Sequence, residues 1–179
     1  MRYSRVAMTK KKHTFEEIAD SDFDLRKITD LEWLVLKTHI YVETMLRRVL
    51  SDKLGLPEDS PALMEMQFSR MAELALGGPN EKSLLEHAGA LNAARNAIAH
   101  ELYVSPGSEA VEAFVAMAIR PRRPDYQWPN AHEEEARRRD FVHAATALIR
   151  PLIDMMTPRE ASWPMARTAR KPLLKPRRK

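Results

Sequence analysis

The residues best suited to chemistry in this 179-residue chain lie in the segment RNAIAH, which contains Arg95, Asn96 and His100. An imidazole can move protons at neutral pH, since its unperturbed pKa is about 6.5. A guanidinium can bind a phosphate through two parallel hydrogen bonds and stabilise charge that develops on it. This pair suits cleavage of RNA, in which the 2′-hydroxyl attacks its own neighbouring phosphate. Asn96 would orient His100 or the phosphate, and DNA, which lacks the hydroxyl, would not react.

A helix is expected to position these side chains, over most of residues 84–103. Ser83 and Glu86 have the spacing of a capping box at its start, and Ser105, Pro106 and Gly107 would end it. An apolar face recurs at steps of three and four residues through Leu84, Ala88, Leu91, Arg95, Ile98 and Leu102. An adjacent polar stripe holds Asn92, Asn96, His100 and Tyr103. Arginine is therefore the exception on an otherwise apolar face, and its burial would require an anion.

The spacing of Arg95 and His100 argues against a tight pair on one helix. Five residues of regular helix separate them by roughly 140° around the axis and ~7.5 Å along it. They can flank one substrate. A second copy of the helix, related by a two-fold axis, would surround one cleft with two arginines and two histidines. The sequence therefore predicts a homodimer with a composite site.

The segment from Arg95 to His100 resembles the R-x(4–6)-H motif of HEPN domains. The preceding chain is similar too, with a long helix, LEWLVLKTHIYVETMLRRVL, and a short amphipathic segment, FSRMAELAL, so that the resemblance covers residues 28–103. It implies a metal-independent endoribonuclease that acts as a dimer on RNA, without a cofactor, as a toxin or phage-defence effector with a possible antitoxin or inhibitor protein. In HEPN toxins neutralised by nucleotidyl transfer, a tyrosine stands two residues after the histidine. Here Tyr103 stands three residues after it, which disfavours that mode of neutralisation.

Two alternatives stay open for these residues. In a structural interpretation, Arg95 pairs with Glu43 or Glu73 at the edge of the core, and His100 caps its helix. In a functional interpretation of another class, the domain is a catalytically silent HEPN-like regulator or adaptor that binds a protein or nucleotide.

The distribution of charge divides the chain into three parts. Residues 1–13 carry a net charge of +5, residues 14–157 carry −8, and residues 158–179 carry +7. We expect a basic N-terminal tail, a helical domain, and a basic, proline-rich C-terminal tail, both tails being disordered. Such tails either attract RNA or only keep the protein soluble. The absence of cysteine excludes disulfides and thiolate metal sites and fits a cytoplasmic protein, and no apolar run is long enough for a membrane span.

The remaining pattern predicts an all-α fold, an up-and-down bundle of four to five helices. Helices are expected over residues 14–24, 29–53, 61–76, 109–119 and 131–156, with a bend or break at Pro151. No carboxylate or histidine pattern suggests a metal site.

The helix at residues 29–53 has two apolar stripes, one for the core and one, with Trp33, Leu36 and Ile40, for a dimer partner. Between the stripes, His39 and Glu43 either line the cleft or form a surface pair.

The loop at residues 120–130 combines arginines with aromatic residues. It would either bind an RNA strand or be held to the surface by its tryptophan. The candidate RNA-binding residues are Asn92, Tyr103, Arg120, Arg122, Arg123 and Trp128.

Overall fold

The computed structural model describes residues 25–100, apart from the side chain of His100, and residues 109–156. In order along the chain, it contains the 3₁₀ turn η1 (Leu25–Lys27) and the helices α2 (Leu31–Leu54), α3 (Pro61–Met64), α4 (Phe68–Leu76), α5 (Lys82–His100), α6 (Glu109–Ile119) and α7 (Glu134–Met155). No strand occurs among these residues, which confirms the predicted all-α class. Five helices have nine or more residues, and the four-residue α3 is additional.

The helix α2 is the central element, and it follows the predicted boundaries closely. Asp30 caps it by accepting a hydrogen bond from the backbone N–H of Trp33 at 2.6 Å. Its predicted core face is buried throughout, with side chains no more than 3% exposed: Leu31, Leu34, Val35, Thr38, Val42, Met45 and Val49. Gly55 ends the helix at φ 65°, a backbone conformation that glycine adopts without steric cost.

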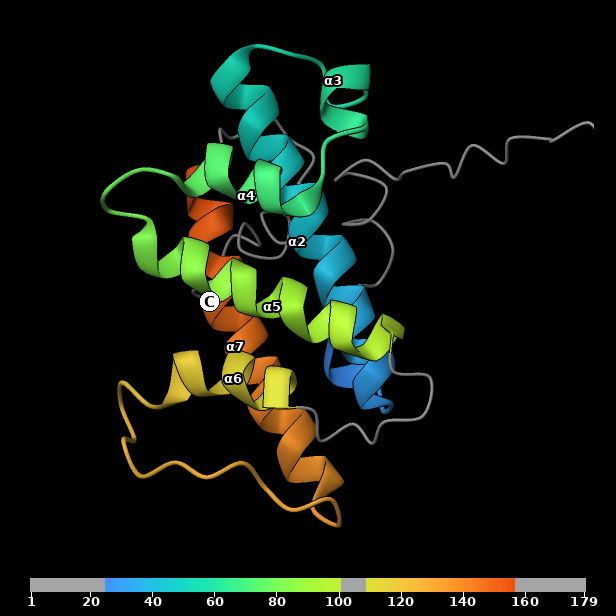
Figure 1. The fold of residues 1–179 in the computed structure, drawn as a ribbon, viewed down its shortest axis with the longest axis vertical. Helices are drawn as coiled ribbons and strands as arrows, with labels where there is room; N and C mark the ends of the chain where they lie inside the picture. The colour runs from blue at the N-terminus through green and yellow to red at the C-terminus, as the bar shows by residue number, and fades with distance from the viewer. Residues whose placement is uncertain (1–24, 101–108, 157–179) are drawn as a thin grey trace, which may run out of the picture.

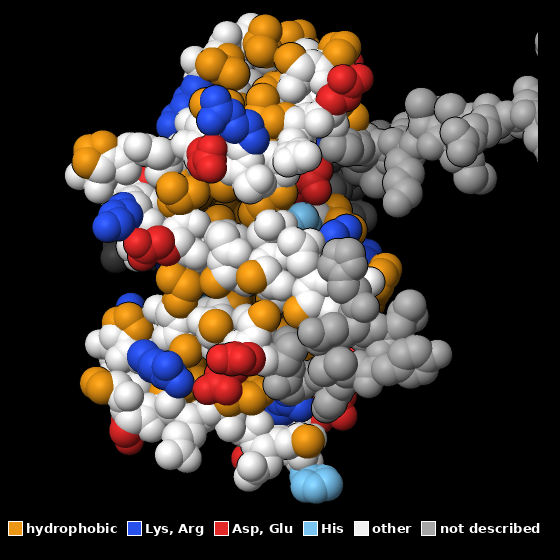
Figure 2. All heavy atoms as spheres, viewed as in Figure 1, with side chains coloured by type: hydrophobic (Ala, Val, Ile, Leu, Met, Phe, Trp, Pro, Cys, Tyr) orange, Lys and Arg blue, Asp and Glu red, His pale blue; other side chains and the backbone are white. Residues whose placement is uncertain are grey.

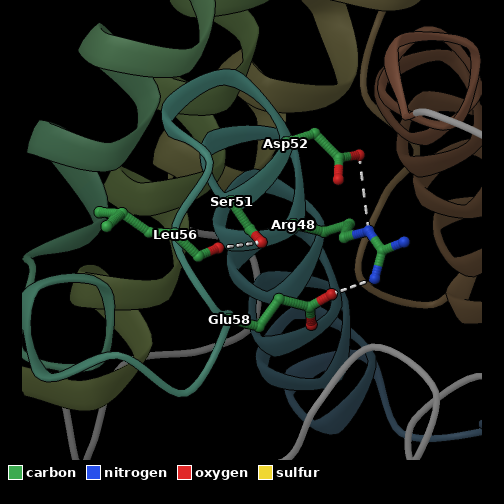
Figure 3. Close-up of polar contacts among 5 residues, drawn as sticks. All are labelled: Arg48, Ser51, Asp52, Leu56 and Glu58. Atoms are coloured by element: carbon green, nitrogen blue, oxygen red, sulfur yellow. Dashed lines mark hydrogen bonds and ion pairs between the residues drawn. The ribbon is translucent and has the colours of Figure 1, made fainter.

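A buried ion-pair cluster fixes the C-terminal turn of α2 to the segment that follows it (Figure 3). Arg48, only 4% exposed, lies 3.5 Å from Asp52 and also contacts Glu58 across the turn. Ser51 donates a hydrogen bond to the carbonyl of Leu56 at 2.6 Å. These contacts hold the turn that follows α2 against the helix. This turn positions the start of the segment that forms α3 and α4.

The predicted single helix at residues 61–76 is wrong, because the structure breaks it after Met64. The break at residues 65–67 lets α4 turn its own apolar face, which includes Phe68, Met71 and Ala75, toward the core. The ammonium of Lys53 on α2 donates to the carbonyl of Ala75 at 2.6 Å and so satisfies a free acceptor at the end of α4.

The helices form two layers. Figure 1 shows α4, α5 and α6 one below another, running across α2 and α7. The contacts agree, because α2 packs on α4, α5 and α7, and α6 packs on α5 and α7. Phe114 of α6 and Phe141 of α7 meet in the core with ring centroids 5.0 Å apart. The site on α5 is thus held from behind by the two longest helices.

The starts of two helices differ from expectation. The helix α5 begins at Lys82, and the backbone N–H of Leu85 donates to the carbonyl of Glu81, so that Ser83 lies inside the helix rather than capping it. The helix α7 begins at Glu134, later than predicted, and continues through Pro151 to Met155. The helix α6 has the predicted boundaries.

Some predictions fall outside the described residues. They concern the tails at residues 1–13 and 158–179, the helix at residues 14–24 and the end of the motif segment, including Tyr103. In the part of the chain that is described, no helix combines the length and the apolar character needed to cross a membrane.

Candidate functional site

Arg95 lies half-buried near the C-terminal end of α5, where the polar stripe of the helix meets its apolar face. Its guanidinium donates a hydrogen bond to the side-chain oxygen of Asn96 at 3.0 Å. The apolar face on either side is buried as predicted, with Leu91 fully enclosed and Ile98 packed against the core. Asn96 therefore orients Arg95, and within the described part of the chain no further hydrogen bond of the guanidinium is seen.

The carboxylate partners suggested for Arg95 bond elsewhere. Glu43 pairs with Arg47 at 2.9 Å on α2, and Glu73 pairs with Arg70 at 3.1 Å on the exposed face of α4. Within residues 25–100 and 109–156, no salt bridge to Arg95 is seen. The arginine is thus a cation at the edge of the core whose charge is not neutralised by a described carboxylate, and a guanidinium of this kind can bind an anion.

His39 is the residue from another helix that reaches this part of α5. Its Nε2 lies 3.1 Å from the side-chain oxygen of Asn92, one turn before Arg95. Its ring stacks on Phe68 of α4, with centroids 4.3 Å apart and the planes inclined by 28°. His39 is only 7% exposed, so that the interpretation as a surface pair with Glu43 is wrong. The elements α2, α4 and α5 all meet at this ring.

The surroundings of His39 favour the neutral imidazole. Burial lowers the pKa of His39 below its ordinary value of 6.5, and the nearby positive charge of Arg95 lowers it further, against the opposing effects of the Asn92 hydrogen bond and the Glu43 charge. Arg95 and Asn92 of α5 thus have opposite effects on the pKa of the His39 imidazole.

The predicted polar stripe is only partly visible. Asn92 and Asn96 are half-buried and lie at the site, as expected. His100 is the last residue of α5, its side chain is not described, and Tyr103 lies beyond the described residues. Among the residues that are described, no group of three or more histidine or carboxylate side chains is arranged to hold a metal ion.

The loop at residues 120–130 lies away from this site. Figure 1 shows it below α6, whereas the C-terminal end of α5 lies above α6 at the right. Arg120 pairs with Glu112 at 3.3 Å, and Arg122 is exposed. The hydroxyl of Tyr126, a buried residue, donates to Asp140 at 3.1 Å, and the guanidinium of Arg123 lies over its ring.

The half-buried Trp128 ring of this loop packs against Arg137 of α7, whose guanidinium carbon is 5.1 Å from the ring centroid. The loop is therefore attached to α7 by its aromatic residues, and its arginines form a surface separate from Arg95.

Figure 2 shows the face of the molecule on which α5 lies. Hydrophobic side chains follow the seams above and below the helix, and a histidine and basic side chains lie toward the right-hand end of the upper seam. The face thus combines apolar and cationic groups beside one another.

The sequence predicted a position beside the site for His39 only as one of two alternatives. Its contact with Asn92 joins residues 53 positions apart, and no local pattern encodes such a pairing. The feature of the sequence that pointed to His39 was its position between two apolar stripes of one helix.

Comparison of this chain with family models, with curated proteins and with solved structures gives no match.

Proposed function

We propose that the protein is a metal-independent endoribonuclease of HEPN type, which cleaves RNA by attack of the 2′-hydroxyl on the adjacent phosphate. The observation that carries the proposal is the state of Arg95. Its guanidinium is oriented by Asn96, forms no salt bridge with a described carboxylate, and lies beside a histidine that burial keeps neutral. A half-buried arginine of this kind supports binding of a phosphate better than a structural role.

In the proposed reaction, Arg95 binds the non-bridging oxygens of the scissile phosphate and stabilises the charge that develops as the 2′-oxygen attacks. His100 takes the proton of the 2′-hydroxyl and returns it to the 5′-oxygen as the P–O5′ bond breaks, and Asn96 holds the guanidinium fork in place. The nucleophile comes from the substrate, so the chemistry needs neither a metal-bound water nor a protein nucleophile. The products are a 2′,3′-cyclic phosphate and a 5′-hydroxyl.

A homodimer completes the proposed site, because Arg95 and His100 lie on different sides of α5 when the helix is regular. Two large apolar side chains on α2 support this arrangement. Trp33 is 51% exposed and Ile40 is 48% exposed, although both belong to a helix whose other face is fully buried. An exposed tryptophan and isoleucine on one helix suit an interface with a second copy.

The decisive experiment incubates purified protein with RNA in the presence of EDTA and identifies the new ends. We expect cyclic phosphate ends, no cleavage of an all-2′-deoxy strand, and a loss on the order of 10²-fold or more for His100→Ala. Arg95→Ala and Arg95→Lys should both be inactive, because an ammonium does not reproduce the two-pronged contact. The matched controls are Arg70→Ala and His143→Ala, which alter exposed residues of the same types.

Growth of cells that express the protein separates the two functional classes. A ribonuclease that acts as a toxin or defence effector should arrest growth, and Arg95→Ala should relieve the arrest. A silent adaptor would be tolerated in both forms and would leave RNA intact. That result, or cleavage that disappears with EDTA, would contradict the proposal.

A further inference from the structure

The contact between His39 and Asn92 fixes the direction of an amide group. An asparagine side chain presents an acceptor oxygen on one side and an NH₂ group with two donors on the other. Here the oxygen is the atom turned toward His39, at 3.1 Å from Nε2. Because that oxygen can only accept, Nε2 must carry the hydrogen. The NH₂ group of Asn92 then lies on the side of the amide that does not contact His39.

The ring of His39 is held firmly enough to impose this direction. It is enclosed on α2, stacked on Phe68 of α4 and bonded to α5, so three elements restrict its rotation. The side chain of Asn92 is only half-buried, and among the described residues no hydrogen bond to its NH₂ group is seen. The amide therefore has one side bonded to His39 and one side without a partner among the described residues.

Arg95 follows Asn92 by three residues, a spacing that brings two side chains on a helix within ~6 Å of one another. Among the described residues, the charged groups that act on His39 are Glu43 on α2 and Arg95 on α5, while α4 contributes the uncharged ring of Phe68. Two neutral donors on Asn92 and a cation on Arg95 are complementary to the oxygens of one phosphate, which only accept.

We propose that His39 is a positioning residue that turns the Asn92 amide so that its NH₂ group and the Arg95 guanidinium bind the same phosphate of the nucleic-acid strand. This inference rests on the proposed function for its substrate class, and it gives a role to a residue of α2 that the sequence placed beside the site only as one of two alternatives. Without His39, the amide can rotate by half a turn and present its oxygen to the phosphate, which repels it.

The test uses the full-length protein and an all-2′-deoxy oligonucleotide, which binds through its phosphates but cannot be cleaved. His39→Phe keeps the aromatic packing on Phe68 and removes the hydrogen bond, so affinity should fall on the order of tenfold, the scale of one hydrogen bond to a charged group. His39→Gln can still donate from the end of its amide and should recover most of that loss. His143→Gln, on an exposed position of α7, is the matched control and should bind like the wild type.

Asn92→Asp separates positioning from structure. Aspartate still accepts the hydrogen bond from His39, so the fold should be retained, but it presents a negative oxygen where the NH₂ group was. It should bind the oligonucleotide more weakly than Asn92→Ala does. If Asn92→Asp binds as well as the wild type, or if His39→Phe binds normally while it remains folded, the inference is overturned.

Nitrogen-15 NMR supplies a readout that does not depend on affinity. We expect the Nε2–H tautomer for His39, and we expect the side-chain NH₂ signal of Asn92 to shift when inorganic phosphate is added. The Nδ1–H tautomer, or an NH₂ signal that phosphate does not move, would contradict the inference. A protein that binds in this pattern but does not cleave RNA would retain the inference and remove the proposed function. If the His39→Phe variant cleaves RNA as fast as the wild type does, the proposed function is retained and the inference about His39 is overturned.

Discussion

The ring of His87 packs against the ring of Phe114 with centroids 4.7 Å apart, so that an ionisable group of α5 is enclosed at the α5–α6 interface. Burial lowers the pKa of His87 from 6.5 to about 4, and a backbone hydrogen bond at Phe114 opposes this only in part. The unfolded chain therefore takes up a proton at a higher pH than the folded chain does. The contribution of His87 to stability is fully present above pH 6.5 and is lost as the pH falls toward 4, by about 3 kcal/mol.

Urea unfolding at several pH values between 7 and 4 measures this loss. His87→Leu should weaken the dependence of the unfolding free energy on pH within this window, because no proton can then bind at that position. His143→Leu, a substitution at an exposed histidine, should leave the dependence unchanged. Equal pH profiles for the wild type and His87→Leu would show that the buried ring does not resist protonation.

Local patterns predicted the elements of this fold, and long-range contacts determined what the patterns missed. The boundaries of α6 depend on neighbouring residues and were predicted correctly, and those of α2 lie within two residues of the prediction. The break after Met64 depends on how α4 packs against the core. The pattern of apolar residues within the segment does not encode that packing. In the site, periodicity put Asn92 and Asn96 on one stripe of α5. The approach of His39 depends on the crossing of α2 and α5 and is a tertiary property.

Removal of Arg48 should destabilise the protein strongly. Its guanidinium is 4% exposed and lies between Asp52 and Glu58, both of which are largely shielded from water. Arg48→Met leaves these carboxylates without their buried cation and should lower the free energy of unfolding by about 3 kcal/mol or more. Glu58→Leu added to Arg48→Met should recover part of that loss, because it removes one of the two carboxylates that lose their contact with Arg48. The control, Arg70→Met, breaks an exposed pair and should cost less than about 1 kcal/mol.

The proposed dimer should depend on the exposed stripe of α2. Trp33→Glu or Ile40→Glu places a charge on a surface that would be buried between two copies, so that each should shift the mass in solution toward the monomer and reduce RNA cleavage in parallel. Leu74→Glu, at an exposed leucine on α4, is the matched control. A wild-type protein that is monomeric at micromolar concentration, or a Trp33→Glu monomer that cleaves RNA at the normal rate, would contradict the composite site.

The arginines and the tryptophan of the loop at residues 120–130 should contribute to different properties. Trp128 is half-buried against Arg137, so Trp128→Ala should lower the free energy of unfolding by about 1–2 kcal/mol through lost aromatic and cation–π contacts. Arg122 is exposed, so Arg122→Ala should leave stability unchanged. If this surface binds RNA, that substitution should weaken binding and reduce the salt dependence of the affinity by about one released ion. The two measurements are unfolding by urea and RNA titration over a range of salt concentrations. A Trp128→Ala protein of normal stability that binds RNA poorly would show instead that the indole ring stacks on a base.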